Sequence, residues 1–226
     1  MGETLVNSGP LLFLGMFVTM AISWLTFIMG PQLQIGRMEQ ATNTVSALQE
    51  RYPNPYPGDA AQGAQVYRAN GCVACHSQQI RAREFGPDIA RYFAVRQSTG
   101  FDYLFDQPVL LGEQRIGPDL AAVGGHMDRN SILLKLYDPQ LGNTPKSVMP
   151  PFRYLFDTRQ IQFHTSSNAL QYLPPELAPP PGWEIVPSAK AEQLAAYLLS
   201  RRQNAFIYYA PAPPTNAPAT NAPAKS

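Results

Sequence analysis

One short motif limits how this chain can fold: Cys72-Val73-Ala74-Cys75-His76. Two cysteines three positions apart, followed directly by a histidine, form the attachment pattern of a c-type haem. The two thiols can add to the two vinyl groups of one porphyrin, and the imidazole of His76 can then bind the iron as its proximal ligand. The sequence contains 2 cysteines, so one covalently bound haem is the most that it can carry. The surrounding domain is therefore expected to fold around a haem.

Two other kinds of site use closely spaced cysteines, and neither fits this sequence. A thioredoxin-like redox pair is expected in a βαβ context, and residues 60–80 show no such alternation of strands and helices. A zinc site needs about four ligands. The chain has 3 histidines, at positions 76, 126 and 164, and no second pair of cysteines. Haem attachment is therefore the favoured interpretation of the motif.

The composition gives no sign of a nucleic-acid partner. The formal net charge is +1, charged residues make up 15% of the sequence, and there is no basic run or stripe. The 23 prolines are concentrated in four places, at 53–57, 145–151, 174–187 and 211–223. Such clustering indicates linkers and extended segments rather than a second hydrophobic core.

Residues 11–29 form an apolar run without a charged residue. At about 1.5 Å per residue the run is roughly 30 Å long, which matches the hydrocarbon core of a bilayer. A cleaved signal peptide would need basic residues before the run, and the first ten residues contain neither Lys nor Arg. It would also need a cleavage site with small residues, and Met29-Gly30-Pro31 is a poor one. We therefore predict a retained transmembrane anchor, spanning about residues 11–30, rather than a signal peptide or a buried core helix.

The charges beside this segment and the haem motif predict opposite orientations. Arg37 and Arg51 follow the apolar run, and by the positive-inside rule they would place the C-terminal side in the cytoplasm. Two charges are weak support, whereas bacteria attach haem to such motifs outside the cytoplasmic membrane. We therefore expect a single-pass protein of the bacterial cytoplasmic (inner) membrane with its haem domain on the periplasmic face.

The chain divides into four parts by composition and helical periodicity. These are a transmembrane anchor with a helical extension, a proline-rich linker, a monohaem domain and a Pro/Ala-rich tail, at residues 1–50, 51–58, 59–205 and 206–226. Within the domain, helices are predicted at 59–70, 129–138 and 188–203. Asp59 and Ser188 are the expected N-caps, and the first and last helices carry small and aromatic stripes that would pack together. The remainder is expected to be irregular, including a proline-interrupted stretch at 152–187.

The second axial ligand can be sought among the methionines and histidines, and Met/His ligation raises the potential of a haem. Beyond the linker, the methionines are Met127 and Met149. Met149 is favoured because two prolines follow it and can hold its loop rigidly, but His126 and Met127 stay open as alternatives. A ligating histidine usually donates its other N–H to an acceptor. The carbonyl of Pro118 is the candidate acceptor for His76.

The residues after the haem motif carry a more specific resemblance. In this order the chain contains Cys-Val-Ala-Cys-His-Ser-Gln-Gln-Ile-Arg at 72–81, Arg-Ile-Gly-Pro-Asp-Leu-Ala-Ala-Val-Gly-Gly at 115–125, Leu-Tyr-Asp-Pro at 136–139 and Ser-Val-Met-Pro at 147–150. Together with one N-terminal anchor, these motifs resemble the monohaem cytochrome c subunit (subunit II) of cbb(3)-type cytochrome c oxidases. The resemblance covers residues 5–155 and the terminal helix, and the stretch 152–187 and the tail depart from it.

The resemblance implies a fold and a ligand set. The fold is all-α: a single N-terminal transmembrane helix followed by a class I cytochrome c domain with long irregular insertions. Cys72 and Cys75 are implied as the thioether sites, and His76 and Met149 as the axial ligands of the haem iron. Pro118 is implied as the residue that orients His76.

Three further residues are candidates for the site. Arg81 and Arg115 are candidate partners of the haem propionates, because a guanidinium pairs well with a carboxylate; the alternative is that both are surface charges. In the resembled family, the neighbourhood of Glu113 lies near a calcium ion at the interface with the catalytic subunit, although a small hydroxyl residue is expected at this position. A calcium ion bound through Glu113 is therefore a further hypothesis.

The resemblance also implies a role in electron transport. The family's subunit takes electrons from a soluble cytochrome c or a dihaem subunit and passes them to haem b of the haem–copper catalytic subunit, which reduces oxygen. This chain has no nucleophile–base constellation, so we expect a non-catalytic subunit of that complex. Two alternatives are the small cytochrome c subunit of a nitric oxide reductase and a membrane-tethered haem sensor. The segment 77–81 argues against the first.

Overall fold

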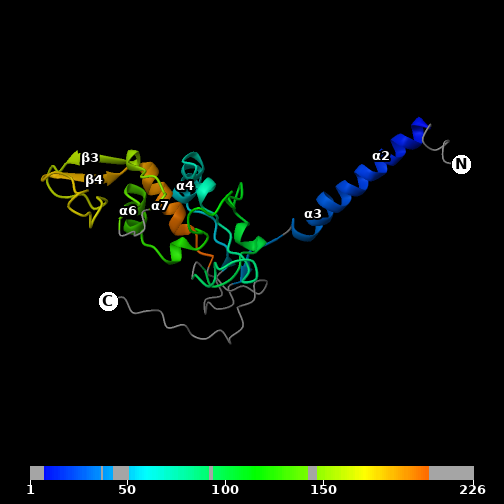
Figure 1. Cartoon of the computed structure of the whole chain (residues 1–226), viewed down its shortest axis with the longest axis horizontal. Helices are drawn as coiled ribbons and strands as arrows, with labels where there is room; N and C mark the ends of the chain where they lie inside the picture. The colour runs from blue at the N-terminus through cyan, green and yellow to red at the C-terminus, as the bar shows by residue number, and fades with distance from the viewer. Residues whose placement is uncertain (1–7, 37, 43–50, 92–93, 142–146, 204–226) are drawn as a thin grey trace, which may run out of the picture. The chain divides into compact units, whose positions relative to one another are not determined.

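The computed structural model describes residues 8–36, 38–42, 51–91, 94–141 and 147–203. It contains two compact units, residues 1–40 and residues 41–226. A long helix makes up most of the first unit, and the second combines helices, long loops and short strands (Figure 1). The predicted Pro/Ala-rich tail lies outside the described residues.

The helix of the first unit consists of three consecutive pieces. These are α2 (Gly9–Trp24), the π-helical turn η1 (Leu25–Met29) and α3 (Gly30–Ile35). The hydroxyl of Ser8 caps its first turn. The π turn comes directly before the Gly30-Pro31 pair, and Pro31 has no N–H to continue the α-helical ladder of hydrogen bonds. The chain therefore passes this proline without ending the helix.

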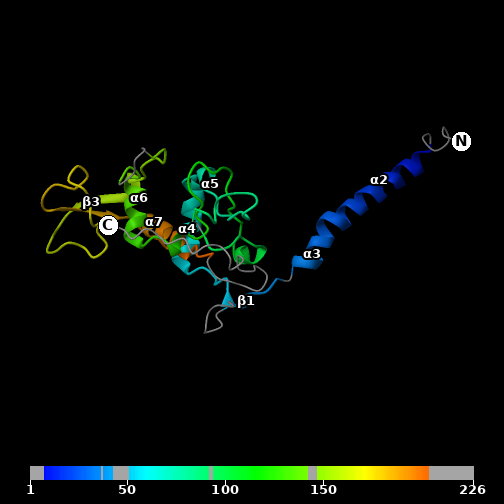
Figure 2. The same cartoon turned by 60° about the horizontal axis from the view of Figure 1, so that its bottom comes forward.

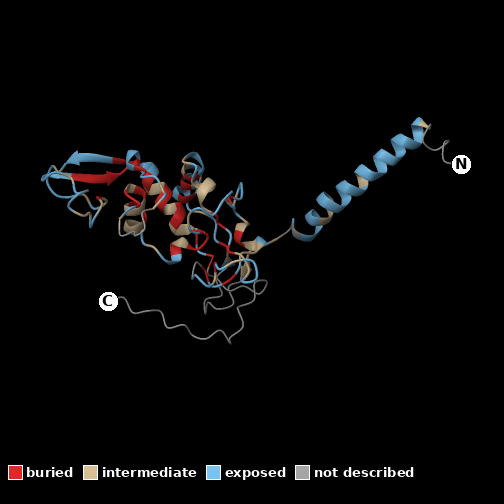
Figure 3. Ribbon diagram, in the orientation of Figure 1, coloured by how far each residue is buried: buried red, intermediate tan, exposed pale blue. Residues whose placement is uncertain are grey.

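The segment Gly9–Gln34 is long and apolar enough to cross a membrane. Helix α2 contains no buried residue, and its ribbon is coloured mostly as exposed (Figure 3). The hydroxyls of Thr19 and Thr26 donate to carbonyls one turn earlier, at 2.9 and 2.8 Å. Their polar groups are thus satisfied within the helix, as a lipid environment requires.

The helix extends less far beyond the membrane segment than predicted. The helix ends at Ile35, and strand β1 (Ala41–Thr42) then pairs antiparallel with strand β2 (Arg51–Tyr52). The predicted helical extension therefore stops at Ile35, and residues 43–50 lie outside the described ones.

The proline-rich stretch predicted as a linker is packed onto the second unit. The hydroxyl of Tyr52 donates to Asp102 at 2.6 Å, and the hydroxyl of Tyr56 donates to Asp106. Asp102 also receives two hydrogen bonds from Arg96, at 2.9 and 2.6 Å, and the side chains of this ion pair are almost fully buried. These contacts attach the stretch to the loop that carries both aspartates.

Helices form the core of the second unit. They are α4 (Gly58–Ala69), α5 (Cys72–Cys75), α6 (Arg129–Tyr137) and α7 (Ala189–Ser200), with 3-10 turns η2 (Gly100–Tyr103), η3 (Val123–Gly125) and η4 (Arg153–Leu155). Ser188 caps α7 as predicted. Helix α4 has Pro57 as its N-cap, so Asp59 lies in the first turn instead.

Helices α4 and α7 pack against each other along their small and aromatic stripes (Figure 1). The rings of Tyr67 and Tyr197 lie 5.4 Å apart, centroid to centroid. The helices lie close together at Gly63, where an added Cβ would lie 1.9 Å from the carbonyl oxygen of Gln193. The packing predicted from the two stripes is confirmed, and the contact depends on a residue without a side chain.

A second antiparallel pair corrects the prediction of an all-α domain. Strand β3 (Phe156–Gln160) pairs with β4 (Trp183–Pro187), with Phe156 opposite Pro187 and Gln160 opposite Trp183. Most of β4 is buried, whereas most of β3 is exposed (Figure 3). The second unit therefore contains helices together with two small sheets, and the stretch 152–187 is partly regular.

Candidate haem site

The two cysteines lie on one turn of helix. Helix α4 is followed by Gly71, whose φ of +70° lies in the left-handed region that favours glycine. The chain turns there and starts α5 beside the end of α4 (Figure 2). Cys72 and Cys75, at positions i and i+3, share one face of this turn. Both are free thiols, and burial raises the pKa of the Cys72 thiol to about 11.

His76 follows in an extended conformation, and its ring is held by one defined contact. The Nδ1 atom lies 2.8 Å from the carbonyl oxygen of Pro118. Because a carbonyl can only accept, the proton of a neutral imidazole belongs on Nδ1, and Nε2 keeps its lone pair. The predicted partner of His76 is thus the one found beside it, and the free nitrogen is the one that can bind a metal.

The segment around Pro118 runs along the whole haem motif. Four backbone N–H groups connect the two stretches, at 2.8 to 2.9 Å: Glu113 to Val73, Gly117 to Cys75, Leu120 to Ser77 and Gln78 to Leu111. The Pro118 carbonyl is therefore fixed on both sides relative to the motif.

Met149 and its alternatives occupy different environments. Met149 is half-buried and packs against the same hydrophobic core as Cys72 and Met127. Its N–H donates to the hydroxyl of Ser147 at 3.2 Å. The side chain of Gln140 makes two hydrogen bonds to the backbone of Ser147, at 2.8 and 3.0 Å. His126 is exposed. Both methionines therefore pack against the same hydrophobic core as Cys72. Met149 lies on a loop held by hydrogen bonds.

Arg81 and Arg115 are close together, but each already has a carboxylate partner. Both guanidinium groups contact Asp88, at 2.8 Å each, and Arg115 also lies 3.7 Å from Asp119. Hydrogen bonds from Arg81 hold the pKa of Asp88 at about 2. Their proposed pairing with propionates stays a prediction.

Sequence reasoning overlooked the two aspartates, although a signal for them existed. The tripeptide Gly-Pro-Asp occurs twice, ending at Asp88 and at Asp119. Both carboxylates are buried in the structure, and both accept hydrogen bonds from backbone N–H groups of the segment that follows the haem motif.

The calcium hypothesis at Glu113 receives no support. The Glu113 side chain is exposed. Within the described residues there is no group of three or more His, Cys, Asp or Glu side chains that could hold a metal ion.

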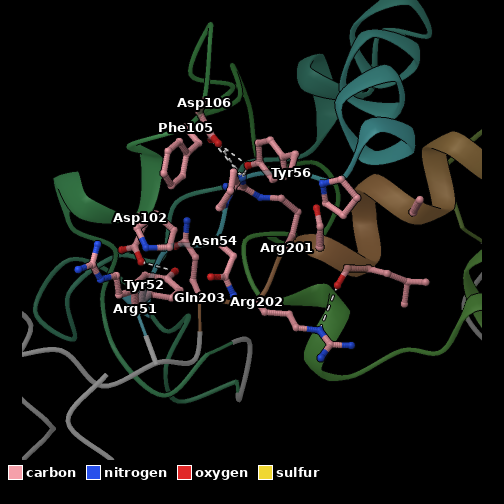
Figure 4. Close-up of a pocket in the computed structure, with 16 residues that line it drawn as sticks. Arg51, Tyr52, Asn54, Tyr56, Asp102, Phe105, Asp106, Arg201, Arg202 and Gln203 are labelled. Atoms are coloured by element: carbon pink, nitrogen blue, oxygen red, sulfur yellow. Dashed lines mark hydrogen bonds and ion pairs between the residues drawn. The ribbon is translucent and has the colours of Figure 1, made fainter. Parts of the chain in front are cut away.

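A cavity of about 660 Å³ lies elsewhere, between the proline-rich stretch 51–57, the Asp102–Asp106 loop and the end of α7 (Figure 4). Arg201 points towards Tyr56 and Asp106, and its Nη1 lies 3.1 Å from both carboxylate oxygens of Asp106. No predicted site residue lines this cavity. We assign it to the attachment of the proline-rich stretch and not to the haem.

The residues around the motif fit a c-type haem. They supply two thiols on one face, an imidazole with a free Nε2 and a thioether packed on the same core. Gly117 leaves room for the ring, because a Cβ at this position would lie 2.3 Å from Cε1 of His76. Next to these groups, Ile116 is 56% and Val148 is 78% exposed. An apolar macrocycle would cover such side chains.

Comparison with known families identifies the chain. A family model described as cytochrome c oxidase, mono-heme subunit/FixO matches residues 5–179. The chain belongs to this family. The resemblance to the monohaem subunit of cbb(3)-type oxidases is thereby confirmed. A comparison with curated proteins gave no match.

The family assignment extends further along the chain than the motifs indicated. It reaches residue 179 instead of 155, so most of the stretch 152–187 belongs to the family, and it does not include α7. Membership implies one haem c and the catalytic subunit of a cytochrome c oxidase as partner.

Proposed function

We propose that this FixO-family subunit is an electron relay. It takes electrons from a dihaem or soluble donor cytochrome and passes them to haem b of the haem–copper catalytic subunit, without an active site of its own. The observation that carries the proposal is the 2.8 Å contact between His76 Nδ1 and the Pro118 carbonyl, directly after two thiols on one helical face. This arrangement supplies an iron ligand with a fixed tautomer next to the points of covalent attachment.

Each residue of the site has a defined task in this class I cytochrome c domain. Cys72 and Cys75 form the thioether bonds, His76 and Met149 bind the iron from its two sides, and Pro118 holds the imidazole. A haem c with two axial side chains supplies reversible one-electron transfer and leaves no open position for a substrate. The residues then have to hold the ligands still, and the hydrogen-bonded Met149 loop and the backbone contacts of Pro118 favour that role.

The N-terminal helix is proposed to anchor the domain in the cytoplasmic membrane. Support comes from a segment, Gly9–Gln34, that is long and apolar enough to span it. Because haem attachment takes place outside that membrane, the domain belongs on the periplasmic face. Protease added to intact spheroplasts should therefore digest the haem domain, whereas a domain protected until lysis would contradict this orientation.

Replacing the proposed axial thioether tests the relay directly. In the oxidase complex, Met149→Leu should keep the haem covalently attached, lower its midpoint potential and stall oxygen reduction, because the thioether ligand that raises the potential is gone. Met127→Leu is the matched control, since Met127 packs against the same core. Absorption spectra and redox titration measure the result. An unchanged potential in Met149→Leu, together with a lowered one in Met127→Leu, would reverse the assignment.

A further inference from the structure

A buried carboxylate lies beside the contact between His76 and Pro118. Asp119 follows Pro118 directly, and its side chain is fully buried. One carboxylate oxygen accepts from the hydroxyl of Ser77 at 2.6 Å and from the N–H of Gln79 at 2.9 Å. The other accepts from the N–H of Ala121 at 2.8 Å. Asp119 therefore joins the residues after Pro118 to the residues after His76.

This junction closes a small ring of contacts. On one side of the pair, the N–H of Gly117 donates to the carbonyl of Cys75 at 2.9 Å, and on the other, the N–H of Leu120 donates to the carbonyl of Ser77 at 2.8 Å. The hydroxyl of Ser77 adds a bond between two side chains, because it donates to Asp119. Moving either His76 or Pro118 would therefore disturb this ring of hydrogen bonds.

We propose that Asp119, acting through Ser77, is the positioning residue for the proximal imidazole, and that it thereby contributes to the potential of the haem. The inference rests on the proposed function, because it requires His76 to be an axial ligand. In this proposal, Asp119 fixes the distance between Nδ1 of His76 and the Pro118 carbonyl. Ser77 is bonded to Asp119 and follows His76 in the chain, so it holds the backbone of the histidine in place.

The surroundings allow a charged carboxylate in this position. Arg115 lies 3.7 Å from Asp119 and donates from its other guanidinium nitrogen to the carbonyl of Gln79 at 2.5 Å. The same Nη1 atom of Arg115 lies 2.8 Å from Asp88, and Asp88 also pairs with Arg81. Two arginines and two aspartates thus lie together, so the buried Asp119 carboxylate has a guanidinium close by.

The potential is the property that separates positioning from simple stabilisation. A hydrogen bond donated by Nδ1 makes the imidazole a stronger donor and favours the oxidised iron. Loosening the bond should therefore raise the potential. Removing the negative charge of Asp119 should raise it as well, so Asp119→Asn combines both effects. Ser77→Ala leaves the charge in place and reports on positioning alone.

The test uses the full-length chain in its purified oxidase complex. Asp119→Asn and Ser77→Ala are compared with wild type by redox titration of the c-type absorption and by EPR of the oxidised low-spin haem, whose g-values report the orientation of the axial ligands. Glu184→Gln and Ser166→Ala are matched controls, because Glu184 is also a buried carboxylate that accepts from a serine hydroxyl, from a backbone N–H and from an arginine. That pair involves the β3–β4 hairpin and no haem-motif residue.

The expected result is a raised potential and altered g-values in both Ser77→Ala and Asp119→Asn, larger in the second, with both properties unchanged in the two controls. Unchanged potential and g-values in Ser77→Ala would overturn the proposal, even if Asp119→Asn shifts the potential, because that shift would then come from charge alone. If Asp119→Asn fails to assemble, Ser77→Ala decides by the same two measurements. A failure of the proposed function is distinguishable: His76→Ala would then retain a low-spin spectrum in the same preparation.

Discussion

Gly117 offers a sharp test of how tightly the imidazole of His76 is enclosed. A Cβ at this position would lie 2.3 Å from Cε1, 2.6 Å from Nδ1 and 2.9 Å from Nε2 of that ring. Ordinary contacts between carbon atoms are about 3.5–4.0 Å. In Gly117→Ala the ring and the Gly117–Pro118 loop therefore have to separate by roughly 1 Å.

That displacement has a cost that can be worked from the contacts. Nδ1 lies 2.8 Å from the Pro118 carbonyl, and N–H···O hydrogen bonds extend to about 3.2 Å, so a movement of that size breaks the bond. Overpacking costs about 1–3 kcal/mol, and a lost hydrogen bond costs about 1 kcal/mol. We expect Gly117→Ala to lower the free energy of unfolding by about 2–4 kcal/mol, or roughly 5–15 °C in Tm.

Thermal unfolding of the haem-loaded protein measures this loss, and the low-spin absorption spectrum reports whether the ring still binds iron. Gly58→Ala is the control, because an added Cβ there meets nothing within 4 Å and Gly58 has no positive φ. We expect a lower Tm and a disturbed spectrum in Gly117→Ala and neither in Gly58→Ala. Equal Tm values and identical spectra for the two variants would refute the close approach of Gly117 to the ring.

Three further substitutions test the surroundings of the site. Asp88→Asn should lower the free energy of unfolding by about 2 kcal/mol at neutral pH, because Arg81 holds the Asp88 pKa at about 2 instead of its usual 3.8. A depressed carboxyl pKa stabilises the fold above the usual value, so urea unfolding should show a constant difference from wild type above about pH 4 that shrinks towards about pH 2; a difference that grows in acid would contradict the pairing. Gly63→Ala should cost about 1–3 kcal/mol, since its Cβ would meet the Gln193 carbonyl, while the haem spectrum stays that of wild type; an unchanged Tm would disprove the close helix contact. Cys75→Ala should reduce the content of covalently bound haem, measured by haem staining of denatured protein, and full staining would show that one thioether suffices.

The sequence predicted those elements that depend on neighbouring residues, such as an apolar run or a helix cap. The uncharged run predicted a helix suited to a membrane, and the helix predicted at 59–70 is found as α4 (Gly58–Ala69). Ser188 predicted the cap of the last helix. The partner of His76 could also be predicted, because a ligating imidazole needs a carbonyl and Pro118 offers a rigid one.

Features that depend on distant pairing were missed for an equally physical reason. Strand β3 has one apolar residue at its start and no alternation, so nothing in Phe156–Gln160 identifies it as a strand. It forms because β4 pairs with it in register after a long connection. Similarly, a helical extension was predicted because the residues after Pro31 contain few helix breakers. In the structure the helix ends at Ile35, and strand β1 pairs with β2 a few residues later.

The segment that made the family recognisable also has a structural explanation. Directly after the haem motif, Ser77 donates to Asp119, and the backbone and side chain of Arg81 donate to Asp88. Gln78 lies between them, fully buried, and accepts a hydrogen bond from Tyr197 on α7. These side chains are held by three different carboxylate or hydroxyl partners, so substitution at any of them would remove a hydrogen bond to a buried polar group. A haem motif alone requires two thiols and an imidazole, whereas the residues that follow it here also need partners from the rest of the domain.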